Sequence, residues 1–302
     1  MNIMVAIVLV NYNGADDTIE CVRSLQNLDY KDYKIIIVDN KSCDDSIQKL
    51  QSLSKEKNII LLQTENNKGF SAGNNIGIRY ALSQLNSDYV WLLNNDTIVS
   101  HNSLSELLKG FENIKDVGIT TAKTYYWKNK KMIWYAGGSI SRKTARTEHW
   151  HYNEIELNDK QNKGNNIPVS FASGCCMLIK REVFEKVGNL DETYFLYEED
   201  ADYCLRIAAA GYTIIYRPSA VIYHKVNAST GKAPGTVQYY SIRNKLWLIQ
   251  KNYKGKNKII ALLYANLQMW TRCLKRELEW KYYRKAVLAY KHGEIGRKEI
   301  QN

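Results

Sequence analysis

The sequence predicts an α/β protein in which a mostly parallel sheet is flanked by helices and followed by an amphipathic helical extension. Four continuous apolar runs, at residues 3–10, 35–38, 59–62 and 90–93, have the length of strands. Apolar strands without alternation are expected where helices cover both faces of a parallel sheet. The segments between these runs carry apolar residues at helical spacing, so strands and helices alternate over about the first 120 residues.

Three helices are expected between these four strands. Each begins near an acidic or hydroxyl residue that can cap a helix N-terminus. Their apolar residues would pack against the sheet. These residues are Ile19, Val22 and Leu25 in the first helix, Ile47, Leu50 and Leu53 in the second, and Ala72, Ile76, Tyr80 and Leu82 in the third.

The middle of the chain is less regular. Residues 125–168 contain three tryptophans and two histidines among mixed charges, without a clear period, and we expect a variable excursion near a ligand site. Regular elements return after this excursion. The further expected elements are a buried strand over residues 171–179, helices over 181–187 and 201–210, and short strands over 214–216 and 221–223.

The length and composition indicate a cytoplasmic globular protein. The 302 residues allow one large domain or two modest ones with a sizeable core. The six cysteines show no CxxC spacing, which is typical of reduced thiols in a cytosolic protein. We recognise no N-terminal signal peptide, and no apolar run approaches the roughly 20 residues of a membrane span.

The positive charge is concentrated near the C-terminus. The net charge is +11, yet residues 225–302 contain 17 Lys+Arg and 4 Asp+Glu, and the first 224 residues contain 25 and 27. Within the basic segment, residues 259–264 with Leu267, Trp270 and Leu274 predict an amphipathic helix. Such a helix suits an anionic membrane surface. The alternative is a helix packed on the sheet with a solvated charged face.

Polar residues follow the predicted strands at the edge where parallel sheets bind ligands. No GxGxxG follows the first strand and no GxxxxGK[ST] occurs, which argues against a nicotinamide dinucleotide site and against a P-loop. Each of these residues alone would be an ordinary solvated loop residue, but four strand ends meet at one edge. The candidates are Asn11, Tyr12, Asn13, Asp39, Asn40, Lys68, Gly69, Asn74, Asn94, Asn95 and Asp96.

Four carboxylates lie within five residues at Glu198, Glu199, Asp200 and Asp202. Carboxylates this close repel one another, which raises the pKa of at least one of them. Proteins often accept that cost where a base, an acid or a metal is needed. The alternative is a solvated acidic turn that caps the following helix.

These residues can be combined into one chemistry. Asp96, at the end of a buried strand, can hold a divalent cation, and His224, at another strand end, is a second candidate ligand unless it is an ordinary surface histidine. Asp39 can accept a hydrogen bond from the imide N–H of uracil or thymine. A carboxylate of the acidic cluster can deprotonate an incoming hydroxyl. Together they suggest glycosyl transfer from a nucleotide diphosphate sugar.

The chain resembles the family 2 inverting glycosyltransferases of the GT-A fold, a Rossmann-like fold, and most closely their bacterial rhamnosyltransferase-type branch. The resemblance covers about residues 4–250. The matching stretches are residues 8–14 (VLVNYNG), 37–44 (IVDNKSCD), 67–77 (NKGFSAGNNIG), 92–97 (LLNNDT), 172–179 (ASGCCMLI), 195–203 (FLYEEDADY), 211–212 and 223–224.

The resemblance implies a role for each matched residue. One departure is Asn94 in place of the first aspartate of the family's DxD motif, which implies a lower metal affinity because an amide oxygen carries no charge. The implied roles are Asp200 as the catalytic base, with Glu199 the next candidate; Asp96 and His224 as ligands of Mn²⁺ or Mg²⁺; Asp39 as the base reader; Lys68 and Asn74 as donor contacts; Gly174 on the acceptor side; Asp202 and Arg206 as supporting partners; and Asn11, Tyr12, Asn13, Asn40, Gly69, Asn94 and Asn95 as further substrate contacts.

The function expected from this resemblance is transfer of a sugar, with L-rhamnose from dTDP-rhamnose as the first candidate, to a saccharide acceptor that is lipid-linked. The setting would be bacterial cell-surface polysaccharide synthesis, peripheral on the inner face of the cell membrane. An alternative donor is a UDP-sugar, either galactofuranose or an N-acetylhexosamine. A nucleic-acid-binding protein is the alternative from another class, but the near-neutral first 224 residues and the absence of RNA-binding motifs disfavour it. A homodimer is a further expectation.

The expected domain organisation has two parts. Residues 1–235 would form the catalytic domain, with a nucleotide-binding half at 1–120 and an acceptor-binding half at 121–235. Residues 236–302 would form the basic helical extension.

Overall fold

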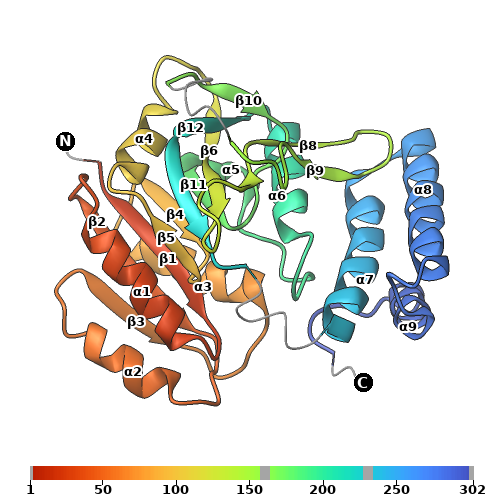
Figure 1. Ribbon diagram of the computed structural model, residues 1–302, viewed down its shortest axis with the longest axis horizontal. Coiled ribbons are helices and arrows are strands. Elements are labelled where there is room, and N and C mark those ends of the chain that lie inside the picture. Colours follow the sequence, from red (N-terminus) through yellow and green to blue (C-terminus); the bar gives the residue numbers. More distant parts are fainter. Residues whose placement is uncertain (1–2, 157–163, 227–233, 299–302) are drawn as a thin grey trace.

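A ten-stranded mixed sheet forms the centre of the molecule (Figure 1). The computed structural model describes residues 3–156, 164–226 and 234–298, and every structural statement below concerns these residues. The strand order is β10-β12-β6-β11-β4-β1-β2-β3, with β5 and β7 paired to β12 and β6 outside this path. The predicted α/β class, with a sheet flanked by helices, is confirmed.

The N-terminal half is a parallel βαβ unit. β1 pairs in parallel with both β2 and β4, and β2 pairs in parallel with β3. The elements are β1 (Val5–Asn11), α1 (Ala15–Gln26), β2 (Tyr33–Asp39), α2 (Ser46–Leu53), β3 (Ile59–Gln63), α3 (Phe70–Ser83) and β4 (Tyr89–Leu93).

The second half adds strands of both directions. β11 runs antiparallel between β4 and β6, whereas β6 and β12 are parallel. The elements are β5 (Thr97–Val99), α4 (Ser103–Lys109), β6 (Val117–Tyr126), β7 (Ile133–Tyr135), β8 (Gly138–Ile140), β9 (Thr147–His149), β10 (Ile167–Val169), β11 (Cys176–Lys180), α5 (Arg181–Val187), α6 (Glu199–Ala209) and β12 (Thr213–His224).

Two expectations for this half were wrong in detail. The two short strands expected at 214–216 and 221–223 are one strand, β12, whose register with β6 shifts between Arg217 and Val221. The strand expected over 171–179 begins only at Cys176. Its expected first part is a buried loop, and a buried loop and a buried strand have the same apolar composition.

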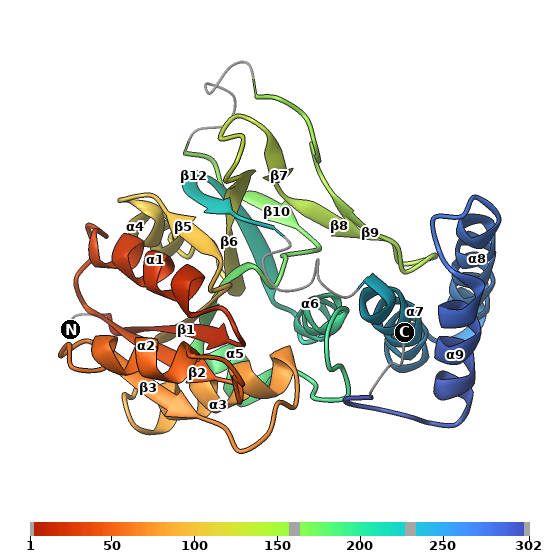
Figure 2. The ribbon, with the colours of Figure 1, turned by 60° about the horizontal axis from the view of Figure 1, so that its bottom comes forward.

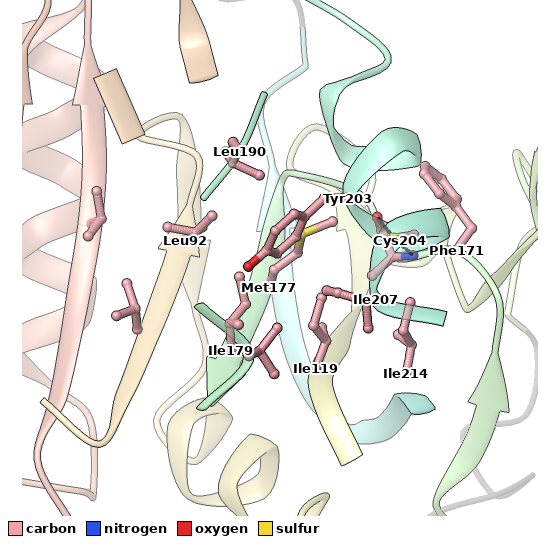
Figure 3. Packing of buried hydrophobic residues seen from close by; sticks show 14 of the residues in the cluster. Leu92, Ile119, Phe171, Met177, Ile179, Leu190, Tyr203, Cys204, Ile207 and Ile214 are labelled. Atoms are coloured by element: carbon pink, nitrogen blue, oxygen red, sulfur yellow. Dashed lines mark hydrogen bonds between the residues drawn. The ribbon is translucent and has the colours of Figure 1, made fainter. Parts of the chain in front are cut away.

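Helices cover both faces of the sheet, which explains the continuous apolar runs. In β1, Ala6 and Val8 belong to one core cluster, and Ile7 and Leu9 belong to the cluster on the other face. Figure 3 shows part of the first cluster, where Tyr203, Cys204 and Ile207 of α6 pack over Leu92, Ile119 and Met177 of the sheet. Full burial of an aliphatic side chain contributes about 1.5–3 kcal/mol.

The C-terminal part consists of α7 (Pro234–Asn252), α8 (Gly255–Leu274) and α9 (Trp280–Lys291). Figures 1 and 2 place α8 at the outer edge of the molecule and α7 between α8 and α6. α7 contacts α6, α8 and α9. The expected boundary at residue 235 therefore falls in the first turn of a helix that packs on the catalytic part.

The helices of the described residues are too short or too polar to cross a lipid bilayer.

Candidate active site

A cleft of about 580 Å³ opens where the carboxyl ends of β1, β2 and β4 meet the start of α6 and the start of α7. Most of the predicted site residues line it, although they come from segments as far apart in the chain as Tyr12 and His224. The predicted residues in its wall are Tyr12, Asn13, Asn40, Gly69, Asn94, Asn95, Asp96, Gly174, Glu199, Asp200 and His224.

Asp96 and His224 meet on one side of this cleft. β5 pairs with the end of β12, so that Thr97 lies opposite His224 and Asp96 lies beside it. An Asp96 carboxylate oxygen (Oδ1) lies 3.0 Å from His224 Nε2, and both side chains are largely buried. The side-chain amide of Asn94 lies 3.5 Å from the same nitrogen.

The donor set fits a hard divalent cation. In a six-coordinate site with bonds of about 2.1 Å, neighbouring ligand atoms lie about 3 Å apart, which is the separation of Asp96 Oδ1 and His224 Nε2. Within the described ranges no group of three or more His, Cys, Asp or Glu side chains surrounds a metal position. The remaining ligands would then be the amide oxygen of Asn94, substrate phosphates or water.

Asp200 lies on another wall of the cleft, in the first turn of α6. The backbone N–H of Gly174 donates to Asp200 Oδ2 at 3.0 Å, which ties the carboxylate to the loop before β11. Burial raises the pKa of Asp200, and the hydrogen bond from Gly174 opposes that rise. A carboxyl whose pKa is raised toward neutrality is suited to accept a proton from a hydroxyl.

Glu199 shares this wall and is more strongly perturbed. Burial, and then the charge of Asp200, raise the pKa of Glu199 well above its ordinary value. Its Oε2 is buried and accepts no hydrogen bond from any residue that the structure describes. Burial without a hydrogen-bond partner therefore favours the protonated form of Glu199 in this wall.

The loop before Asp200 has an unusual backbone. Tyr197 and Glu198 both have positive φ, 71° and 73°, which costs free energy for residues with a side chain. α7 holds the loop in this shape. The side-chain amide of Asn244 donates to the carbonyls of Leu196 and Tyr197, and Lys245 lies 2.7 Å from the carboxylate of Glu198.

Gly69 joins the donor side of the cleft to this loop. Its φ is +97°, and a Cβ at this position would lie 2.2 Å from the carbonyl oxygen of Phe195. The next residue, Phe70, donates its backbone N–H to that same oxygen. Only glycine allows this approach.

Asn11 and Asp39 lie behind the cleft wall. Asn11 donates to Asp39 Oδ2 and accepts from Thr18, while Ser42 donates its N–H and its hydroxyl to the two oxygens of Asp39. Both residues are buried, and in this structure they brace the ends of β1 and β2. Base reading by Asp39 stays a prediction.

The other predicted residues outside the cleft wall have different surroundings. Asp202 accepts hydrogen bonds from Arg206 and from Asn252 of α7. Arg206 also donates to the carbonyls of Val187 and Asn189, so the Asp202–Arg206 pair anchors the loop before α6.

The two predicted donor contacts also lie outside the cleft wall. Asn74 is buried, and its side-chain amide donates to the carbonyl of Phe70. Lys68 is exposed.

Sequence reasoning missed several cleft residues. Trp134 and His149, from the irregular segment expected near a ligand site, line the cleft, and the Trp134 ring packs edge-on against His224. Burial lowers the pKa of His149, which favours its neutral form. The aromatic content of the segment was the only signal. Further apolar residues of the cleft wall that were not predicted include Val10, Phe70, Phe195, Leu196, Tyr197 and Val237.

The sequence profile of the family "Glycosyl transferase family 2" matches residues 6–188, more than half of the chain. The chain belongs to glycosyl transferase family 2. The predicted resemblance is thereby confirmed. The matched stretch contains the strand ends of the cleft and stops before Asp200.

The chain is also similar to several named glycosyltransferases. The chain is 29% identical over 203 residues to the low-salt glycan biosynthesis hexosyltransferase Agl10 of Haloferax volcanii, covering 67% of this chain and 60% of that protein. It is 44% identical over 69 residues to an N-acetylglucosaminyl-diphospho-decaprenol L-rhamnosyltransferase of Mycobacterium tuberculosis, covering 23% of this chain and 22% of that protein. It is 24% identical over 314 residues to the dTDP-rhamnosyl transferase RfbF of Shigella flexneri, covering 98% and 97%.

The fold is shared with solved glycosyltransferases. A crystal structure of GalNAc-T7 with UDP, GalNAc and Mn²⁺ matches with a TM-score of 0.65 at 16% identity, over 82% of this chain and 48% of that one. At this identity the match establishes the fold alone. The predicted GT-A fold is therefore confirmed.

Proposed function

We propose that the protein is an inverting glycosyltransferase that moves a sugar from a nucleotide diphosphate donor to a hydroxyl group of a saccharide acceptor. The observation that carries this proposal is the cleft itself, which Asp200 enters from one wall and the Asp96–His224 pair from another. Membership of family 2 supports the same reaction.

In the proposed reaction Asp200 is the general base. As the acceptor oxygen forms a bond to the anomeric carbon, its proton passes to the Asp200 carboxylate. The bond between that carbon and the donor phosphate oxygen breaks on the opposite face, so the configuration inverts and the nucleoside diphosphate leaves. A divalent cation, Mn²⁺ or Mg²⁺, held by Asp96 and His224 would neutralise the departing diphosphate.

We propose dTDP-rhamnose as the donor and a lipid-linked saccharide as the acceptor. RfbF, a dTDP-rhamnosyl transferase that aligns with nearly the whole chain, supports the donor. The mycobacterial relative, an N-acetylglucosaminyl-diphospho-decaprenol L-rhamnosyltransferase, supports the lipid-linked acceptor. The apolar wall of the cleft at Phe195, Leu196 and Val237 can accommodate a partly apolar acceptor. The setting would be bacterial cell-surface polysaccharide synthesis at the inner face of the cell membrane.

The donor is tested by thermal shift with Mn²⁺ and a panel of nucleotide sugars, followed by transfer assays with the best donor. The panel contains dTDP-rhamnose, UDP-galactofuranose and UDP-N-acetylglucosamine. We expect dTDP-rhamnose to raise the melting temperature most and to be consumed when acceptor is present. A larger shift and faster turnover with a UDP-sugar would replace the proposed donor, and no transfer from any sugar would contradict the reaction. Size-exclusion chromatography of the same preparation tests for a homodimer.

A further inference from the structure

Helix α8 has two different apolar faces. The inner face carries small or slender side chains at every fourth position, which pack into the third core cluster together with α7 and α9. This inner face is buried by contacts within the molecule. Its residues are Ala261, Ala265, Met269 and Cys273.

The other face carries large apolar side chains that point into solvent. Leu263 is 68% exposed and Leu267 is 61% exposed. We call this face the outer stripe of α8. A continuous row of exposed large apolar side chains on a monomer usually marks a binding surface. The stripe consists of Ile259, Ile260, Leu263, Leu267, Trp270 and Leu274.

The stripe lies at the edge of the molecule, on the helix that Figures 1 and 2 place farthest from the central sheet. Trp280, at the start of α9, packs edge-on against Trp270 with ring centroids 6.0 Å apart and is itself exposed. Tryptophan is the residue most suited to the boundary between lipid and water. The helix is about 30 Å long, enough to lie along a surface over several lipid headgroups.

Basic residues stand at both ends of the stripe and none within it. From Ile259 to Thr271 the chain carries no charged side chain. Lys254, Lys256 and Lys258 precede this stretch and pair with no carboxylate in the described part of the chain. Arg272, Lys275 and Arg276 follow it and are exposed; Glu277 forms only a long, exposed pair with Arg272.

This charge pattern decides between the two possible occupants. In a pair formed with a second copy, the basic ends would meet basic ends whether the helices ran parallel or antiparallel, because both ends carry the same sign. Like charges that are brought next to each other in this way destabilise the helix pair. An anionic bilayer instead offers apolar chains to the stripe and negative headgroups to both ends.

We propose that the outer stripe of α8 is a docking surface for an anionic lipid bilayer. The helix lies in the plane of the interface, with Leu263, Leu267 and Trp270 among the acyl chains and the two basic clusters at the headgroups. This proposal does not depend on the sugar transferred, and binding is measured without turnover.

The test is co-flotation of the full chain with vesicles made of equal parts phosphatidylglycerol and phosphatidylcholine. We expect the wild-type protein to float with these vesicles and much less with phosphatidylcholine alone. The double variant Leu263→Gln, Leu267→Gln should bind at least tenfold more weakly. Its matched control is Tyr152→Gln, Ile155→Gln, which removes two exposed apolar side chains elsewhere and should float like the wild type.

A second variant tests the charges independently and keeps the proposal testable if the first does not fold. Replacing Lys254, Lys256 and Lys258 with glutamine should weaken binding on the order of 100-fold, since each basic residue near the surface contributes about fivefold. The control replaces the exposed Lys55, Lys57 and Lys115. Wild-type flotation of either test variant would overturn the proposal. So would a wild-type dimer that ignores vesicles and dissociates when Leu263 and Leu267 are changed, because a second copy would then be the occupant.

Discussion

The ammonium group of Lys245 lies 2.7 Å from the carboxylate of Glu198, two residues before the proposed catalytic base, and both side chains are nearly buried. The same lysine donates to the carbonyl of Ala145 in the turn between β8 and β9. One side chain of α7 thus connects the acidic cluster to the hairpin that carries His149 into the cleft. The C-terminal helices are therefore part of the support of the active site.

Replacing Lys245 should change the pH dependence of transfer. The charge of Lys245 lowers the pKa values of both Glu198 and Asp200, against the burial that raises them. In Lys245→Met this charge is lost, so Asp200 takes up its proton at higher pH, and the acidic limb of the kcat profile should shift to higher pH. The exposed Lys115→Met is the control. An unshifted limb would mean that Asp200 does not titrate in this profile.

Asp200→Asn should reduce kcat by about 10³-fold, because the acceptor hydroxyl loses its proton acceptor. Nucleotide binding should stay within about twofold, since Asp200 lies on a different wall of the cleft from the Asp96–His224 pair. Isothermal titration with dTDP and a transfer assay measure the two effects separately. Near-normal turnover of Asp200→Asn, together with an inactive Glu199→Gln, would move the base to Glu199.

Asp96→Ala should remove the response to metal. In the wild type, Mn²⁺ is expected to raise the melting temperature when dTDP is present, because ligands that bind the native state stabilise it. The variant lacks one of the two close ligand side chains, so its apparent Mn²⁺ affinity should fall at least tenfold. Glu65→Gln, at an exposed loop, serves as the matched control. If both variants respond to Mn²⁺ alike, the cation is held elsewhere.

Glu199→Gln should stabilise the protein at alkaline pH. Burial raises the pKa of Glu199 in the folded state above that of the unfolded chain. The stability that the protonated side chain contributes is therefore fully present below the pKa of Glu199 in the unfolded chain. It is lost as the pH rises through the pKa of Glu199 in the folded state. Wild type and variant should melt together near pH 4 and diverge by several degrees near pH 8, with the variant higher. A difference that is the same at every pH would show that ionisation of Glu199 is not its cause.

The N-terminal half was predictable because its signal is local. Its strands, β1 to β4, are apolar runs whose residues belong to the two core clusters. The candidate site residues could be identified because they come directly after these runs. The same reasoning reached Asp96 and His224, although their contact depends on the pairing of β5 with β12. No spacing in the sequence reveals a pairing between segments so far apart.

β6 shows why other parts could not be predicted. It is a buried central strand, yet it contains Thr120, Thr121, Lys123 and Thr124. Two of these polar groups have specific partners, because the Thr121 hydroxyl donates to the carbonyl of Cys176 and the Lys123 ammonium pairs with Glu156. Such partners exist only in the folded chain, so the sequence of β6 does not look like a core strand.

α7 shows that a basic segment can also be part of the core. It lies in the basic C-terminal part of the chain, but Arg243 and Asn244 are fully buried. Arg243 stacks over the rings of Tyr239 and Tyr240, and Asn244 binds the loop before α6. The basic composition of the C-terminal segment thus combines two tasks, support of the active site by α7 and the charged ends of the outer stripe on α8.

The two left-handed residues before Asp200 limit how this protein can be divided or recombined. A chimaera joined at residue 235 would inherit Tyr197 and Glu198 without the amide of Asn244 that holds their backbone in place. A junction after Asn252 would keep that amide but would remove α8 and α9, which share a core cluster with α7. We therefore expect the graftable unit of this enzyme to include all three C-terminal helices.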